Sequence, residues 1–216
     1  MRLKSFGCSF IFGTDLHDDG RNLPIPIASQ YTWPALLAQH NNWDYSCYAR
    51  GGSGNLQITE RLLNQLADVE PAVYIVSWTW IDRFDYTTTD ARYNWRTIMP
   101  VDTDDLAKTY YRDIHSEYRD KLTTLINIRV AIDALKNSGN KFIMTYMDEL
   151  MFDQRWHCTP AVSELQRYCQ PYMTRFDGKT FLDYSRDRGF AISPTLHPLE
   201  EAHAAAAELI ASYNLV

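Results

Sequence analysis

Short apolar runs recur along this chain, and segments with apolar residues three or four positions apart lie between them. The run PAVYIVSW at 71–78 is apolar almost throughout, which is typical of a strand buried on both faces of a parallel sheet. The other runs predict further strands at 3–8, 44–49, 141–147 and 189–192.

Helical spacing fills most of the chain between the predicted strands. The pattern predicts helices over 31–40, 56–69, 105–137, 161–173 and 198–214. Segment 79–104 has no regular pattern and is expected to be irregular. Alternating strands and helices predict an α/β fold, a three-layer α/β/α sandwich with a mostly parallel sheet. No linker or repeat divides the chain, so we expect residues 1–216 to form one domain.

Composition and charge exclude several classes of function. The net charge of −6 argues against nucleic acid as a partner, because a phosphate backbone needs a concentrated basic face. No apolar run reaches the roughly 18 residues of a membrane span, and we expect no signal peptide. The four cysteines form no C-x-x-C pair, which favours free thiols in a reducing cytoplasm. His157–Cys158 has no second half of a metal site, so we expect neither metal nor cofactor.

Ser9 is the first candidate for chemistry, because it follows the first predicted strand and precedes a turn. A serine there could expose its hydroxyl beside backbone N–H groups, or it could simply cap a helix. Its neighbour Cys8 is the rival nucleophile, although we expect that side chain to point into the core. A serine nucleophile needs a base, and His197, between Pro194 and Pro198, is the candidate; the alternative is a surface histidine.

Two further segments at the same predicted sheet edge carry candidate binding residues. Gly54 and Asn55 end the turn GGSGN, which could bring donors to a ligand at a helix N-terminus; Asn55 could instead only cap that helix. Trp78, Trp80 and Arg83 follow the strongest strand and are candidates for substrate contact. The Arg83 fork could bind a carboxylate or phosphate, or it could close a structural salt bridge.

The order of these parts resembles the SGNH (GDSL-like) hydrolase superfamily, and more closely its phage and marine-bacterial members with a GCSF-like first block. The resemblance rests on Gly7-Cys8-Ser9 in the first block, on the glycine turn after the second strand, and on the His197-Pro198 pair before the last helix. It implies a flavodoxin-like sheet of about five strands. It also implies that Ser9 is the nucleophile and His197 the base, and that the Ser9 and Gly54 N–H groups hold the oxyanion with help from Asn55.

Two positions depart from the family pattern. The asparagine of the third block is missing from the stretch at 77–83, and Pro194 stands where the family places an aspartate before the histidine. A backbone carbonyl or a residue from elsewhere such as Asp183 then orients His197, or no residue does and the pair of Ser9 and His197 acts as a dyad. The resemblance implies a serine esterase or deacetylase acting on a small-molecule ester or an acylated carbohydrate. The alternative is a non-catalytic binding module or a phage structural or assembly protein on the same fold.

Overall fold

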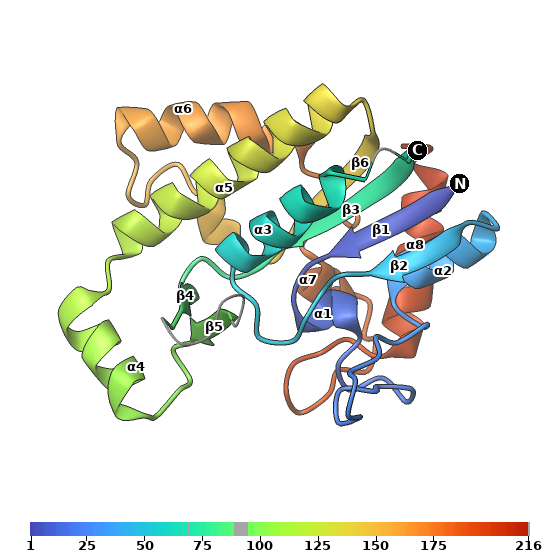
Figure 1. Cartoon of the computed structure of the whole chain (residues 1–216), viewed down its shortest axis with the longest axis horizontal. Coiled ribbons are helices and arrows are strands. Elements are labelled where there is room, and N and C mark those ends of the chain that lie inside the picture. The colour runs from blue at the N-terminus through green and yellow to red at the C-terminus, as the bar shows by residue number, and fades with distance from the viewer. Residues whose placement is uncertain (69, 89–94, 216) are drawn as a thin grey trace.

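A parallel sheet forms the centre of the molecule in the computed structural model, which describes residues 1–68, 70–88 and 95–215 (Figure 1). Its four strands lie side by side in the order β2-β1-β3-β6. Their bounds are β1 (Arg2–Phe6), β2 (Asp44–Cys47), β3 (Ala72–Trp78) and β6 (Lys141–Tyr146). Because all four strands run in one direction, the loops that follow them meet at a single edge of the sheet.

Helices cover both faces of this sheet, so the predicted three-layer α/β/α sandwich is confirmed (Figure 1). One layer contains α1 (Ser9–Phe12), α2 (Trp33–His40), α7 (Phe181–Asp187) and α8 (Glu200–Ser212). The other layer contains α3 (Asn55–Leu66), α5 (Glu117–Ser138) and α6 (Pro160–Cys169). Each layer encloses its own apolar core against the sheet.

Strand β3 shows how the sequence builds both cores at once. All seven of its residues are buried. Val73 and Ile75 belong to the core beneath α2 and α8, whereas Tyr74, Val76 and Trp78 belong to the core beneath α3 and α5. Successive side chains of a strand point to opposite faces, so an unbroken apolar run is what a central strand between two helical layers requires.

The sheet has one strand fewer than the five expected. Residues 189–192, which we expected to form a strand, contribute only an isolated bridge between Ile192 and Pro198. At the open edge of β6 the chain makes one parallel bridge, from Met144 to Met173, and the Thr174 N–H donates to the Met144 carbonyl at 2.7 Å. The 3₁₀ turns η2 (Glu149–Met151) and η3 (Gln170–Tyr172) lie before and after α6 in the chain. Within the described residues, this single bridge does not extend into a fifth strand beside β6.

The segment predicted to be irregular contains an antiparallel hairpin, β4 (Phe84–Thr87) with β5 (Trp95–Ile98). The single helix expected over 105–137 is also wrong. The chain forms α4 (Asp105–Thr109) and a π-helical turn η1 (Tyr110–Ile114), and a new helix begins after Ser116. Ser116 is the N-cap of α5, because its hydroxyl accepts from the Arg119 N–H.

Candidate active site

Ser9 begins the helix that follows the first strand. Strand β1 ends at Phe6, Cys8 is extended, and Ser9 is the first residue of α1. Gly13 ends this single turn with a φ of 85°, a left-handed conformation that favours glycine. Ser9 is therefore placed at the edge where the sheet's loops meet, with its backbone N–H in the first turn of a helix.

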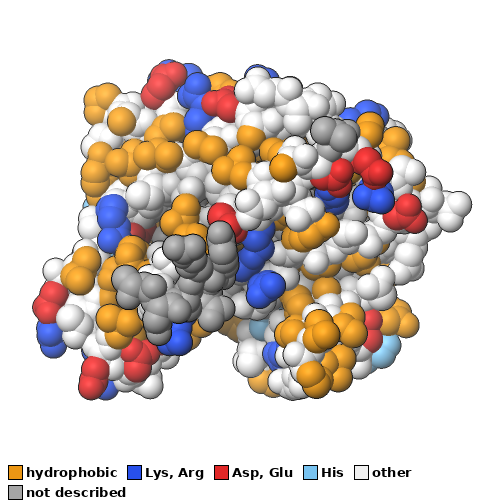
Figure 2. Space-filling model, in the orientation of Figure 1, with side chains coloured by type: hydrophobic (Ala, Val, Ile, Leu, Met, Phe, Trp, Pro, Cys, Tyr) orange, Lys and Arg blue, Asp and Glu red, His pale blue; other side chains and the backbone are white. Residues whose placement is uncertain are grey.

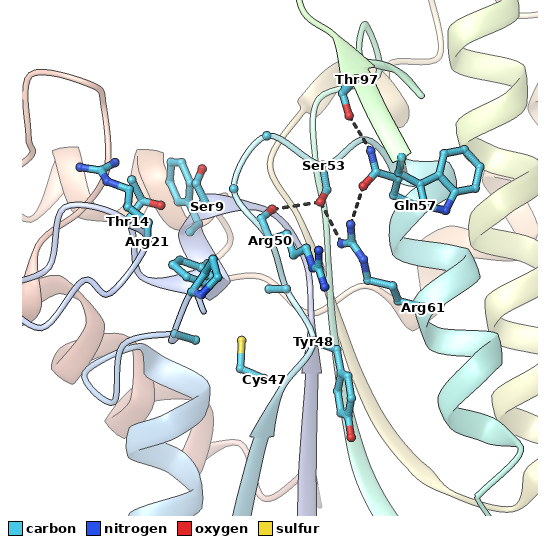
Figure 3. A pocket seen from close by; sticks show the side chains of 18 of the residues that line it. Ser9, Thr14, Arg21, Cys47, Tyr48, Arg50, Ser53, Gln57, Arg61 and Thr97 are labelled. Carbon is cyan, nitrogen blue, oxygen red and sulfur yellow. Dashed lines mark hydrogen bonds between the residues drawn. The ribbon is translucent and has the colours of Figure 1, made fainter. Parts of the chain in front are cut away.

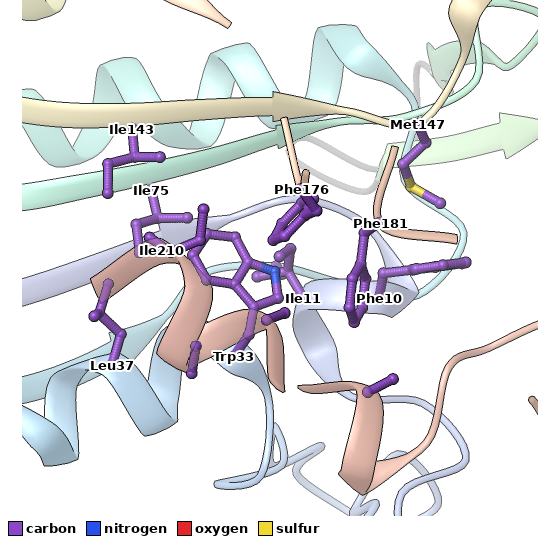
Figure 4. Close-up of a cluster of buried hydrophobic side chains, with 14 of the residues drawn as sticks. Phe10, Ile11, Trp33, Leu37, Ile75, Ile143, Met147, Phe176, Phe181 and Ile210 are labelled. Atoms are coloured by element: carbon purple, nitrogen blue, oxygen red, sulfur yellow. The ribbon is translucent and has the colours of Figure 1, made fainter. Parts of the chain in front are cut away.

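Apolar packing holds this four-residue helix in place, because so short a helix has little stability of its own. Phe10 and Ile11 are buried in the core that also contains Trp33, Phe176 and Phe181 (Figure 4). Cys8 is fully buried, with its thiol 3.5 Å from the Met147 sulfur. The expectation that Cys8 points into the core agrees with this position, which leaves Ser9 as the nucleophile candidate.

His197 is oriented by Asp15, a residue that the sequence analysis did not single out. The His197 Nδ1 atom lies 2.7 Å from Asp15 Oδ2, and the two side chains are 12% and 17% exposed. A carboxylate on Nδ1 fixes the tautomer and the ring orientation, so that Nε2 remains for proton transfer. Asp15 comes from the loop after α1, so one short segment supplies both Ser9 and the partner of His197.

The Asp15 carboxylate is held by hydrogen-bond donors on every side. The Ser193 hydroxyl donates to Oδ2 at 2.7 Å, Thr195 donates to the same oxygen, and Arg21 donates to Oδ1 at 2.7 Å. Burial alone would raise the pKa of Asp15, but the hydrogen bonds from Thr195, Ser193, His197 and Arg21 outweigh it and hold that pKa well below its ordinary value. Asp15 is therefore ionised wherever the protein is folded near neutral pH.

The backbone is strained on both sides of this contact. Asp15 has a φ of 71° and Leu196, directly before His197, has a φ of 68°. The left-handed region is tolerated by aspartate but is unusual for leucine. Strained residues of this kind cluster at functional sites, where the surrounding structure holds them in place.

Ser9 and His197 line the same cleft, which has a volume of about 1280 Å³ (Figure 3). The ring of Phe10, the residue after Ser9, contacts two other rings that line the cleft. Its centroid lies 5.2 Å from the His197 ring and 5.8 Å from the Trp80 ring. Among residues 1–68, 70–88 and 95–215, the Ser9 hydroxyl makes no hydrogen bond to His197, and its contact is the Cys8 sulfur at 4.0 Å. Catalytic hydrogen bonds are often loose before substrate binds.

Asp183, the candidate to orient His197, serves another purpose. It lies in the first turn of α7, where its carboxylate accepts the Thr180 hydroxyl at 2.8 Å and lies 3.6 Å from Arg186. The correction is that Asp15 takes this role, because the loop after α1 and the loop before α8 meet at the sheet edge.

The roles expected for Gly54 and Asn55 are also corrected. The Gly54 N–H already donates to the buried Asp85 carboxylate at 3.0 Å, and the Gln57 N–H donates to the second oxygen at 3.0 Å. Asp85 thus caps α3 from strand β4. The Asn55 side chain accepts from the Thr79 N–H at 2.9 Å and donates to the Thr79 carbonyl at 3.2 Å, which ties α3 to the loop after β3.

The three candidates for substrate contact divide into two groups. Trp78 is fully buried in the core and does not line the cleft, so its expected role is wrong. Trp80 and Arg83 do line the cleft, and the Arg83 guanidinium stacks 4.8 Å from the Trp80 ring. Within the segment 79–104, which contains Trp80 and Arg83, residues 89–94 lie outside the described chain.

Two of the other histidines have partners outside the candidate site. His203 is buried, and its Nδ1 accepts the Trp33 N–H at 3.0 Å. His157 is paired with Glu117 at 3.0 Å on the surface. Within the described residues, no three His, Cys, Asp or Glu side chains gather as metal ligands would. No helix of that part of the chain is long and apolar enough to cross a membrane.

Comparison with known proteins identifies the fold. No protein-family model matches this sequence, and no curated protein matches it significantly. Solved structures do match: a psychrotrophic esterase of Pseudoalteromonas superposes with a TM-score of 0.55 over 99% of this chain and 95% of its own, at 9% identity. A lipolytic G-D-S-L family protein of Veillonella parvula gives 0.53 over 98% and 97%, at 13% identity. This chain has an SGNH-like hydrolase fold.

A third structure carries the same fold as part of a longer chain. An acetyl xylan esterase of Butyrivibrio proteoclasticus gives a TM-score of 0.53 at 14% identity, covering 98% of this chain and 62% of the esterase. The likeness extends over nearly the whole SGNH-like chain, although the sequences have diverged. The resemblance seen in the sequence is therefore confirmed at the level of the fold.

Proposed function

We propose that this protein is a serine esterase in which Ser9 is the nucleophile, His197 the general base and Asp15 the residue that orients the base. The observation that carries the proposal is the 2.7 Å contact between Asp15 and His197 Nδ1 in the cleft that Ser9 also lines. A weak nucleophile, a base and a third group that orients the base are the parts that nucleophilic acyl transfer needs.

The reaction begins with attack of the Ser9 oxygen on the ester carbonyl. His197 Nε2 takes the hydroxyl proton, and Asp15 stabilises the resulting imidazolium. The tetrahedral intermediate then expels the alcohol, which receives its proton from His197. Water, activated by the same histidine, attacks the acyl-enzyme; the acid leaves and Ser9 regains its hydroxyl proton.

The oxyanion needs donors other than those expected from the sequence, because Gly54 and Asn55 are occupied. The Ser9 N–H lies in the first turn of α1, and no acceptor for it is found among the described residues. Gly51 and Gly52 also line the cleft, and their N–H groups have no backbone acceptor within the same part of the chain. We assign the oxyanion hole to the Ser9 N–H and the backbone of this turn. Each such donor contributes about 10²–10³ in rate.

The substrate class proposed is an acyl ester of a small molecule or a carbohydrate. Esterase and acetyl xylan esterase structures among the similar folds support this class. The cleft supports it too, since Trp80 offers an aromatic face and Ile25, Leu196 and Val101 offer apolar contacts along its rim.

Hydrolysis of 4-nitrophenyl acetate and labelling by a fluorophosphonate probe test the proposal. We expect labelling that disappears in Ser9→Ala, and hydrolysis that falls at least about 10³-fold in both Ser9→Ala and His197→Ala. Ser212→Ala and His157→Ala are the matched controls, because both residues are exposed and lie outside the cleft. Hydrolysis that both active-site variants retain would refute the proposal.

A non-catalytic binding module is the second candidate, and one observation favours it. Asp85 occupies the N–H of the glycine that the family resemblance assigns to the oxyanion hole. This reading predicts that wild-type protein is not labelled by the probe, although it binds ligands in the same cleft. The labelling experiment therefore separates the two candidates.

A further inference from the structure

The cleft beside Ser9 is basic although the protein as a whole is acidic. The chain has a net charge of −6, but the charged residues lining the cleft are four arginines and one glutamate among the described residues. Figure 2 shows Lys and Arg side chains in the hollowed middle of one face. The arginines of the cleft are Arg21, Arg50, Arg61 and Arg83. Such a local reversal of charge raises the local concentration of anions.

Two of these arginines, Arg61 and Arg83, donate to Ser53 in the glycine-rich turn, and Figure 3 shows the bond from Arg61. Arg61 Nη1 donates to the Ser53 hydroxyl at 2.8 Å, and Arg83 Nη1 donates to the Ser53 carbonyl at 2.9 Å. The Ser53 hydroxyl also donates to the backbone carbonyl of Arg50 at 3.0 Å, and Arg50 lines the same cleft. Arg50, Arg61 and Arg83 therefore line the cleft from the glycine-rich turn, the middle of α3 and the loop after β3.

No salt bridge joins these three guanidinium groups to a carboxylate in the part of the chain that the structure describes, and Arg61 and Arg83 donate to neutral oxygens. Arg21 differs, because Asp15 and Asp19 pair with it at 2.7 and 2.9 Å. Burial, and next the positive charge of Arg50, lower the pKa of Arg61 to about 10. The negative charges of Asp85 and Glu60 act in the opposite direction but do not outweigh these effects. Cations that lie close together without a direct ion pair are stabilised when an anion enters.

We propose that Arg50, Arg61 and Arg83 form a subsite for an oxyanionic group, a carboxylate, sulfate or phosphate, carried by the ester substrate. This inference rests on the proposed esterase function, because Ser9 in the same cleft attacks that ester. Guanidinium forks pair with planar or tetrahedral oxyanions through two parallel hydrogen bonds, so three of them suit such a group better than a neutral sugar hydroxyl.

Two matched pairs of substrates test the subsite. The first pair is 4-acetoxybenzoate and neutral 4-acetoxybenzamide, with the charge on the alcohol side. The second pair is mono(4-nitrophenyl) glutarate and neutral 4-nitrophenyl pentanoate, with the charge on the acyl side. We expect kcat/KM, corrected for alkaline hydrolysis rates, to favour the anionic member of at least one pair by about ten-fold or more. Added NaCl should reduce this preference.

Variants locate the preference in the cleft. Arg50→Gln is the first choice, because Arg50 is exposed and its removal leaves the folded contacts in place. We expect it to lower the anionic-to-neutral ratio of kcat/KM about ten-fold, and Arg83→Gln to do the same. Arg112→Gln is the control, since Arg112 is exposed, pairs with Asp113 and is not among the residues that line the cleft. A ratio that Arg50→Gln and Arg83→Gln both leave unchanged would overturn the subsite.

Titration with inorganic phosphate, followed by calorimetry on Ser9→Ala protein, separates this inference from the hydrolase proposal. If no ester is hydrolysed but phosphate binds and Arg50→Gln weakens it, the anion site stands and the esterase proposal fails. If neutral esters are hydrolysed, neither pair shows a preference and phosphate does not bind, the esterase stands and the subsite fails. Phosphate binding without any preference for anionic esters would overturn the claim that the substrate carries the anion.

Discussion

Replacing Asp15 by asparagine tests the catalytic arrangement at its most specific point. Asp15 Oδ2 contacts His197 Nδ1 at 2.7 Å, while Oδ1 faces Arg21 at 2.7 Å. An asparagine can keep its carbonyl toward His197 and turn its amide toward Arg21, which is 45% exposed and free to move away. The substitution therefore removes the negative charge while it keeps an acceptor for the imidazole N–H.

The expected loss follows from that charge. The charge centres of an imidazolium and a carboxylate in this contact are about 4 Å apart, which corresponds to about 4 kcal/mol at the effective dielectric constant of a partly buried pair. The imidazolium exists only once His197 has taken the Ser9 proton, so this energy stabilises the transition state and not the ground state. We expect kcat/KM for 4-nitrophenyl acetate to fall about 10³-fold.

Asp183→Asn is the matched control, because Asp183 was the candidate orienter that the sequence suggested. Its carboxylate accepts the hydroxyl of Thr180, the N-cap of α7, and makes no hydrogen bond to His197. We therefore expect less than a two-fold effect on kcat/KM, at a small cost in helix capping. Thermal unfolding of both variants checks that each is folded. A folded Asp15→Asn protein with activity within five-fold of wild type would refute the assignment of Asp15.

Three further substitutions test the surrounding framework. Burial lowers the pKa of His203 to about 3 in the folded protein. Below about pH 6.5 the unfolded chain therefore binds a proton that the folded protein does not, and stability is lost as the pH falls. His203→Gln should reduce the difference between the unfolding free energies at pH 7.5 and pH 5.5, measured by urea denaturation, by about 1.4 kcal/mol. Gly54→Ala would place a Cβ 2.5 Å from Asp85 Oδ2 and should lower the free energy of unfolding in the same assay by about 2–4 kcal/mol. If the variant unfolds at the same urea concentration as the wild type, Asp85 is not a buried cap. Phe10→Ala should lower the free energy of unfolding by about 3–5 kcal/mol and weaken the packing of His197. Calorimetric unfolding and kcat/KM measure the two effects, and no change in either would contradict the role of Phe10.

The layers of the fold could be predicted from the sequence because burial determines the pattern. An apolar run such as 71–78 has no stable place except between two helical layers, and the structure buries all of β3. The breaks within the predicted elements were missed for local reasons. Ser116 followed by Glu117 is an N-cap with an acid in the first turn, and this signal lies inside what resembled one long helix. The hairpin of β4 and β5 was missed because each strand has only four residues, two of them apolar or aromatic, which is too short a pattern to stand out.

The site was predictable only as far as its parts follow strands in sequence order. Ser9 and His197 stand where a parallel sheet collects its loops, and that placement follows from topology. Asp15 could not be assigned in this way, because it lies within the loop after α1, where strand order does not fix which side chain reaches His197. The available signal was a polar loop directly after the glycine that ends α1. A search for an aspartate only near the histidine overlooks a partner that lies near the nucleophile.

The position of Asp85 explains why the glycine-rich turn is available to a ligand while Gly54 is not. A carboxylate from β4 takes the Gly54 and Gln57 N–H groups, so the start of α3 is already neutralised from within the protein. The Gly54 and Gln57 N–H groups at the start of α3 are therefore not available to an anion that enters the cleft. What remains are guanidinium groups gathered on Ser53, the residue directly before Gly54. In the subsite that we propose, guanidinium side chains and not the backbone amides at the start of α3 would therefore recognise the anion.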